Sequence, residues 1–335
     1  MLSKLQEYME IEKRALYNLL RMNWLNDSSD DEPQQWQIDD YRTLPIKTLF
    51  SRLQKLGIAI DQNAFLAYSE DVESPEELTE FFLDDINLEA IEQDQAYLLV
   101  FELWRRLLPE RLCLSIFCDE LDHQIHLYDR GDLSSAETIQ DSIANLQMIM
   151  DENVDQGVDP VDIMKTVSEG CANNLETFFY DYISEQIDEG HLPYAEELVE
   201  GFGRYFKANK WFELLKIRIT AAFDSEASHE DLRKIVQKAA KDEDLSFNLE
   251  ILSIIVQVGE KGEFNKIVRK TIPLLKTEED FLDLLFICSD YYRCLDEDQK
   301  EQNIQEIIAN RQTKILENPL NPSDQEVAKL LKILR

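Results

Sequence analysis

Residues 246–258 read SFNLEILSIIVQV, and this stretch decides the fold class of the chain. Wound as a helix, it is apolar on nearly every side, through Ile251, Leu252, Ile254, Ile255, Val256 and Val258. A helix that is apolar all round is buried between neighbours, whereas a surface helix has one polar face. The stretch therefore predicts a buried helix with further helices packed around it.

The segments on either side repeat an amphipathic helical pattern. One example is residues 174–189, which end at Gly190 and align one apolar stripe: Leu175, Phe178, Phe179, Tyr182, Ile183 and Ile187. The pattern predicts helices that begin near residues 174, 193, 210, 228, 246, 263, 278 and 297. Every second start is separated by about 32–36 residues, which is the period of stacked helical hairpins.

Over roughly residues 173–316 this period resembles that of tetratricopeptide-like α-solenoids. Ala195 matches the small residue of that family's second helix, and Val199 and Phe202 match its later packing positions. The family's first-helix Trp, Leu-Gly and Tyr pattern and its closing proline are absent. The resemblance implies a curved stack whose concave face binds a peptide or protein. The alternative is an irregular bundle of helices of similar length.

The whole chain is expected to be all-α, because it has only nine glycines and nine prolines in 335 residues and shows no strand alternation. We expect antiparallel hairpins stacked as a solenoid in the C-terminal half and an irregular helical bundle in the N-terminal half. The predicted segments are 1–43, an N-terminal helix and acidic linker; 44–158, an acidic helical domain; and 159–335, a helical-repeat domain.

The charge of the chain is strongly and unevenly negative. Its 34 basic and 68 acidic side chains give a formal charge of −34. Residues 1–200 hold 13 basic and 44 acidic side chains, whereas residues 201–335 hold 21 basic and 24 acidic side chains. Such a field repels nucleic acid and anionic membranes and favours a basic protein partner, although it can also serve solubility alone. A cluster of basic residues, Arg204, Lys207, Lys210, Lys216 and Arg218, is expected to contact the acidic half, residues 1–200, of the same chain or of a second copy.

Two motifs have the spacing of metal sites. DENVDQGVDPVD, residues 151–162, matches a calcium loop in Asp151, Asn153, Asp155, Asp159 and Asp162. It departs from that loop at Gln156, where glycine makes the sharp turn, and Asp159-Pro160 is already a good helix start. We therefore interpret the stretch as an acidic connection between helices.

The second motif is CDELDHQIHLYDRGD, which contains the ExxH pair Glu120 and His123. Asp119, Asp122, His123 and His126 fall on one helical face at ligand spacing. A di-iron bundle needs a second inward-facing ExxH, and Glu226 with His229 lies at a helix start instead. A solvated, hydrogen-bonding helix face is the preferred interpretation, with no metal and no cofactor bound.

Enzyme signatures are absent from the sequence: no phosphate-binding loop, nucleophile elbow or HExxH string occurs. The spacings of the five cysteines match no CxxC pair, and no apolar run is long enough to span a membrane. These two features indicate a cytoplasmic protein with reduced cysteines. Most aromatic residues are expected in the core, but Tyr180, Tyr205 and Trp211 fall off the main stripes and could face a partner.

We predict a non-enzymatic scaffold or adaptor that binds a basic protein segment. An acidic nucleic-acid mimic and a metal-binding helical-bundle enzyme are the alternatives.

Overall fold

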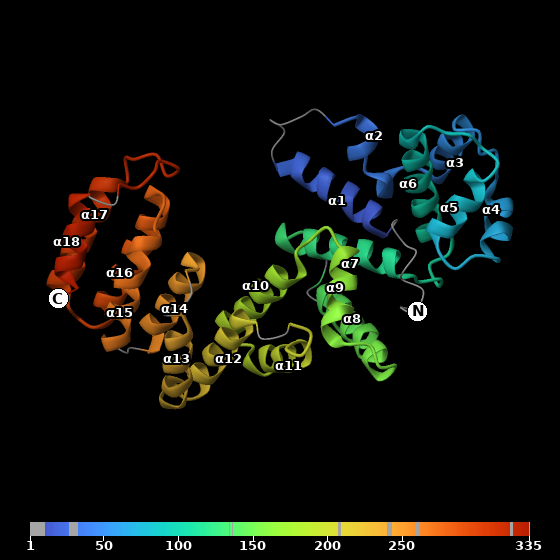
Figure 1. The fold of residues 1–335 in the computed structure, drawn as a ribbon. Coiled ribbons are helices and arrows are strands. Elements are labelled where there is room, and N and C mark those ends of the chain that lie inside the picture. The colour runs from blue at the N-terminus through green and yellow to red at the C-terminus, as the bar shows by residue number, and fades with distance from the viewer. Residues whose placement is uncertain are drawn as a thin grey trace. The chain divides into compact units, whose positions relative to one another are not determined.

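The computed structural model describes residues 11–26, 33–133, 135, 137–206, 209–239, 243–258, 261–321 and 324–334. These residues are helical, with short turns between the helices, and the described ranges contain no β-strand (Figure 1). Their nearest approach to a sheet is an isolated bridge between Thr277 and Pro319. The prediction of an all-α chain is thus confirmed for the described residues.

The chain divides into two compact units, Met1–Phe179 and Tyr180–Arg335. We call them the first unit and the second unit and describe each by itself. The division falls inside one helix, Leu175–Asp188 (α10). The predicted segments 1–43, 44–158 and 159–335 stay a prediction about independent domains.

The core of the first unit surrounds α6, whose Tyr97, Phe101 and Trp104 are almost completely buried. α3 and α5 pack on α6, while α1 packs on α7 and α9. α5 begins as its sequence indicates, because the Ser74 hydroxyl accepts a hydrogen bond from the Glu77 amide and Pro75 opens the first turn. The helices of this unit are α1 (Ile11–Asn26), α2 (Gln35–Ile38), η2 (Tyr41–Thr43), α3 (Ile46–Lys55), α4 (Gln62–Ser69), α5 (Pro75–Leu83), α6 (Ala90–Leu107), α7 (Leu114–Asp129), α8 (Glu137–Asp155) and α9 (Pro160–Glu169).

In the second unit, consecutive helices pack on one another, including α11 on α12 and α13 on α14. α12 packs with α13, α14 with α15, and α16 with α17, while α14 also contacts α12 and α16. After α10, the helices are α11 (Leu192–Phe202), α12 (Lys210–Phe223), α13 (Ser225–Ala239), α14 (Leu245–Val258), α15 (Lys261–Thr271), η3 (Ile272–Leu274), α16 (Glu278–Cys294), α17 (Asp298–Arg311) and α18 (Gln325–Ile333). Each observed start of α10 to α17 lies within three residues of the predicted one.

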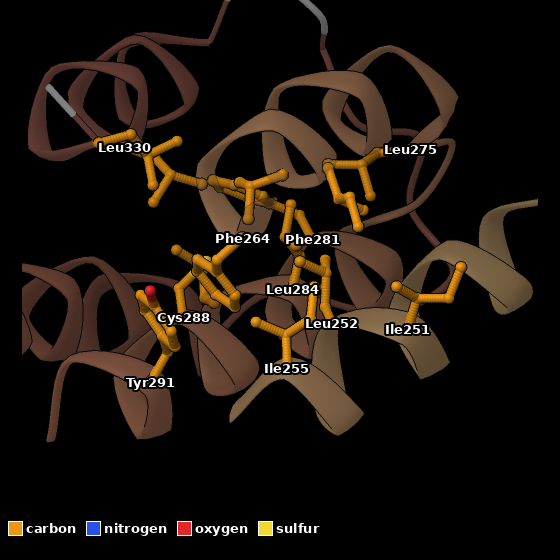
Figure 2. Packing of buried hydrophobic residues seen from close by; sticks show 14 of the residues in the cluster. Ile251, Leu252, Ile255, Phe264, Leu275, Phe281, Leu284, Cys288, Tyr291 and Leu330 are labelled. Atoms are coloured by element: carbon orange, nitrogen blue, oxygen red, sulfur yellow. The ribbon is translucent and has the colours of Figure 1, made fainter. Parts of the chain in front are cut away.

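The apolar stretch that predicts the fold class lies inside the core of the second unit. Ile251, Leu252 and Ile255 of α14 are fully buried, and Figure 2 shows them beside side chains from other helices, including Phe264 and Tyr291. The Phe264 and Tyr291 rings stack with their centroids 3.6 Å apart. α14 contacts helices on several sides, so the prediction of a helix buried among neighbours is confirmed.

Candidate functional site

A cavity of about 540 Å³ opens in the first unit between α1, the 37–43 turn and α7. Five arginines line it: Arg14, Arg21, Arg42, Arg105 and Arg130. This concentration of guanidinium groups contrasts with the acidity of residues 1–200, which contain only 13 basic side chains. We call this cavity the arginine pocket.

α7 contributes the four residues that the sequence places at metal-ligand spacing. Asp119, Asp122, His123 and His126 all line the arginine pocket. The prediction that they share one helical face is confirmed, but the expectation of a solvated face is wrong, because Asp119 and Asp122 are buried. Glu120, the other member of the ExxH pair, accepts a hydrogen bond from Arg42 Nη1 at 2.9 Å. Its carboxylate is therefore engaged by an arginine.

Asp119 is the centre of an ion-pair network on the wall of the pocket. Its buried carboxylate accepts hydrogen bonds from Arg14 Nε at 2.7 Å and Asn18 Nδ2 at 2.9 Å, and it pairs with Arg42 Nη2 at 2.5 Å. Burial alone would raise the pKa of this carboxyl, but the two guanidinium groups outweigh burial and hold its pKa well below the usual range. Asp119 thus joins α1 and the 37–43 turn to α7.

Asp122 has a different structural role. Its carboxylate accepts hydrogen bonds from the Ala172 amide at 2.7 Å and the Asn173 amide at 3.0 Å, so it ties α7 to the loop before α10. Burial raises the pKa of Asp122 to about 6, despite these hydrogen bonds. Both carboxylates of the α7 face therefore have protein partners.

The two histidines lie beside cationic groups. Burial lowers the pKa of His123, and nearby Arg42 lowers it further. Burial likewise lowers the pKa of His126, with Arg130 and Arg21 adding to the effect. Both imidazoles are therefore neutral at neutral pH.

These contacts bear on the predicted metal motifs. Within the described ranges, no group of three or more histidine, cysteine, aspartate or glutamate residues has the geometry of a metal site. The second ExxH pair lies on α13, which belongs to the second unit. The expectation that the chain binds no metal stays a prediction, to be tested by titration.

The stretch 151–162 forms the acidic connection that its sequence favours. α8 continues to Asp155, and Gly157 then turns the chain with a φ of +93°. Asp159 caps α9 by accepting a hydrogen bond from the Val161 amide at 2.9 Å. Asn153 donates a hydrogen bond to the Ile149 carbonyl at 2.7 Å. Two of the five predicted calcium ligands are thus engaged in local hydrogen bonds.

A second surface feature lies on α4 and α5. Tyr68 is 43% exposed and Phe81 is 55% exposed, and their ring centroids are 5.3 Å apart. Both rings contact Phe82, which belongs to the core of this unit. We call this surface the Tyr68–Phe81 face.

The surroundings of the Tyr68–Phe81 face are acidic. Residues 56–104 contain thirteen acidic residues and no basic one. On α5 and at its end, Glu77 precedes Phe81 by one helical turn, and Asp84 and Asp85 follow it by about one turn. Glu80, Asp84 and Asp85 are exposed, and none of them pairs with a basic side chain in the described part of the chain. The face therefore combines exposed aromatic surface with uncompensated negative charge.

Of the three aromatic residues expected to face a partner, Tyr205 is buried, which contradicts the expectation, and Tyr180 and Trp211 are half-buried. Tyr205 is 1% exposed, and Trp211 packs between Tyr180 and Phe247, with ring centroids 5.1 Å and 5.2 Å away. No sequence signal separates Phe81 from Phe82, because other consecutive aromatic pairs of this chain, such as Tyr291 and Tyr292, are both buried.

The basic cluster of the second half is paired inside the second unit. Lys210 contacts Asp244 at 2.7 Å, and Arg218 contacts Asp188 at 2.6 Å. Lys207 lies outside the described residues. Arg218 thus contacts the acidic half, as expected, whereas Lys210 contacts a residue outside it.

Comparison with known proteins identifies no relative: no family model, no curated protein and no solved structure matches this chain. None of the described helices combines the length and the apolar character that crossing a membrane requires. The arginine pocket and the Tyr68–Phe81 face are the two candidate functional sites of the first unit.

Proposed function

We propose that this protein is a non-enzymatic helical scaffold whose first unit binds a basic segment of another protein in the cytoplasm. The observation that carries the proposal is the exposed Tyr68–Phe81 pair in a region of thirteen acidic residues without a basic one. Aromatic side chains are common anchors of protein interfaces, and charge complementarity steers the partner toward them. Arginine or lysine side chains can also lie over the aromatic rings as cation–π partners.

The second unit supports the scaffold role through its helix pairs. Contacts between α12, α14 and α16, and between α13 and α15, support a stack of hairpins like that of a tetratricopeptide-like solenoid. We propose that residues 173–316 form such a stack. Its role is to hold an extended surface rigid while the first unit receives the basic segment.

The test uses a labelled peptide of alternating arginine and leucine, with fluorescence anisotropy as the measurement. We expect the Tyr68→Ala/Phe81→Ala variant to bind this peptide roughly tenfold more weakly, because it loses both anchors while its net charge is unchanged. The matched control is Phe223→Ala, which removes a ring that is 61% exposed at the end of α12. The control should bind the peptide as the wild type does.

Two outcomes would contradict the proposal. Equal affinity of the wild type and the Tyr68→Ala/Phe81→Ala variant would show that diffuse charge alone holds the peptide. Failure of the wild type to bind the peptide at low salt would rule out a basic protein segment as the partner. A Glu80→Gln/Asp84→Asn/Asp85→Asn variant should bind less tightly and with a weaker dependence on salt.

A further inference from the structure

The lining of the arginine pocket contains more hydrogen-bond donors than acceptors. Each guanidinium carries five N–H donors, whereas a carboxylate only accepts. Five aspartates also line the pocket, and each has a protein partner: besides Asp119 and Asp122, Asp39 accepts from Arg52 at 2.7 Å, Asp40 accepts from Arg21 at 3.2 Å, and Asp132 pairs with Arg130 at 3.1 Å. The arginines contact these carboxylates with only some of their N–H groups. The unused donors fit a ligand rich in acceptors.

The cationic groups converge from separate elements of the fold. Arg21 projects from α1 and Arg130 caps the end of α7, yet both are close enough to His126 to lower its pKa. Arg42 from the η2 turn and Arg105 from α6 act in the same way on His123. The pocket therefore has two clusters, each with one neutral imidazole and two guanidinium groups. Carboxylates accompany the guanidinium groups in both clusters, Asp119 and Glu120 beside Arg42 and Asp132 beside Arg130. The clusters therefore offer guanidinium donors and not an excess of positive charge.

The size of the pocket favours a small molecule, and two of its arginines, which pair with Asp40 and Asp132, remain accessible. About 540 Å³ is within the range of small-molecule sites, and it exceeds what a single ion occupies. Arg21 and Arg130 keep 31% and 59% of their side-chain surface exposed, so a ligand can reach them. Guanidinium groups bind phosphate and carboxylate oxygens in paired, planar hydrogen bonds.

We propose that the arginine pocket binds a small organic molecule through an oxyanion, a phosphate or carboxylate group held by Arg21 and Arg130 beside His126. His126 and His123 donate ring N–H groups to the same ligand. The site is formed by α1, η2, α6 and α7, so it is separate from the Tyr68–Phe81 face and can be occupied while a protein partner is bound.

Isothermal titration of the full chain with four probes tests the proposal. Phenyl phosphate and benzoate carry the two oxyanions on a common ring, inorganic phosphate is the bare anion, and benzamide is the uncharged match of benzoate. We expect saturable binding of phenyl phosphate, benzoate or both, tighter than that of inorganic phosphate and with no binding of benzamide. The tighter of the two organic anions identifies the oxyanion class.

The variants Arg21→Gln and Arg130→Gln should each weaken binding of that anion roughly tenfold, because each removes one charge-assisted contact. Arg293→Gln is the matched control, since Arg293 is 64% exposed and pairs with Asp290 at 2.8 Å in the second unit. The double variant Arg21→Gln/Asp40→Asn keeps the net charge of the protein and should also weaken binding. Its effect would show that the lost guanidinium contact, and not a change in net charge, weakens binding. The NMR titration midpoint of His126 should rise when the anion is bound.

The proposal is overturned if neither phenyl phosphate nor benzoate binds saturably, or if benzamide binds as well as benzoate. It is also overturned if the Arg21 and Arg130 variants bind as tightly as the Arg293 control. Thermal unfolding of each variant checks that the fold is retained. Because the altered side chains are partly exposed, we expect unfolding midpoints close to that of the wild type.

Discussion

At the scale of single residues, the most heavily paired side chain of the second unit is the fully buried Arg311. Its guanidinium forms ion pairs with Glu278, with Asp324 at 2.5 Å and with Glu326 at 2.7 Å, and it lies over the Phe281 ring. These contacts join the start of α16, the end of α17 and the start of α18. Removing one member of such a network leaves buried charges without partners, which costs more than the network contributes as a whole.

We therefore expect Arg311→Ala to lower the free energy of unfolding by about 3–5 kcal/mol, measured by urea denaturation. Arg293→Ala is the control, because its single exposed ion pair should change that free energy by less than about 0.5 kcal/mol. A loss below about 1 kcal/mol for Arg311→Ala would mean that water reaches the remaining carboxylates.

At the scale of the helical elements, the turns depend on a few backbone conformations. Gly157 between α8 and α9 has a φ of +93°, a region that residues with a Cβ rarely adopt. Gly262 lies at the start of α15 in an ordinary helical conformation. A Cβ added at either glycine meets no atom within 4 Å. The two sites therefore differ in backbone conformation and not in available space.

This difference predicts effects of opposite sign for the same substitution. Gly157→Ala should lower the free energy of unfolding by about 1 kcal/mol, because alanine is strained at positive φ. Gly262→Ala should raise it by up to about 1 kcal/mol, because alanine favours the helix and restricts the unfolded chain. Urea denaturation measures both, and a stabilising Gly157→Ala would show that the turn adopts another conformation in solution.

At the scale of the whole molecule, a formal charge of −34 makes the folded chain repel itself. Most of this charge lies in residues 1–200, and the Tyr68–Phe81 face is surrounded by it. Salt screens repulsion between exposed charges as the Debye length falls from about 30 Å at 0.01 M to about 3 Å at 1 M. Salt therefore has opposite effects on folding and on the binding of a basic partner.

We expect the thermal unfolding midpoint to rise with sodium chloride over this range, while the affinity for the arginine–leucine peptide falls. Differential scanning fluorimetry measures the first effect and anisotropy the second. The Glu80→Gln/Asp84→Asn/Asp85→Asn variant should show a smaller response in both measurements. A midpoint that falls as salt rises would indicate that favourable ion pairs, such as those of Asp119 and Arg311, outweigh the repulsion.

The sequence by itself determined the elements of this protein. Helical periodicity placed the starts of α10 to α17 within three residues, and Ser74-Pro75 and Asp159-Pro160 marked the starts of α5 and α9. Helix starts depend on side chains and backbone groups only a few residues apart, so the local sequence is sufficient to specify them.

Only the tertiary structure decided the candidate sites. Asp119 meets Arg14 across 105 positions of the chain, and nothing in the spacing of either residue specifies the other. In the same way Tyr205, in the turn between α11 and α12, became buried, whereas Phe81 on α5 remained exposed. An apolar or charged stripe determines that a helix face will be covered or paired, but the partner is selected by the simultaneous packing of many distant side chains.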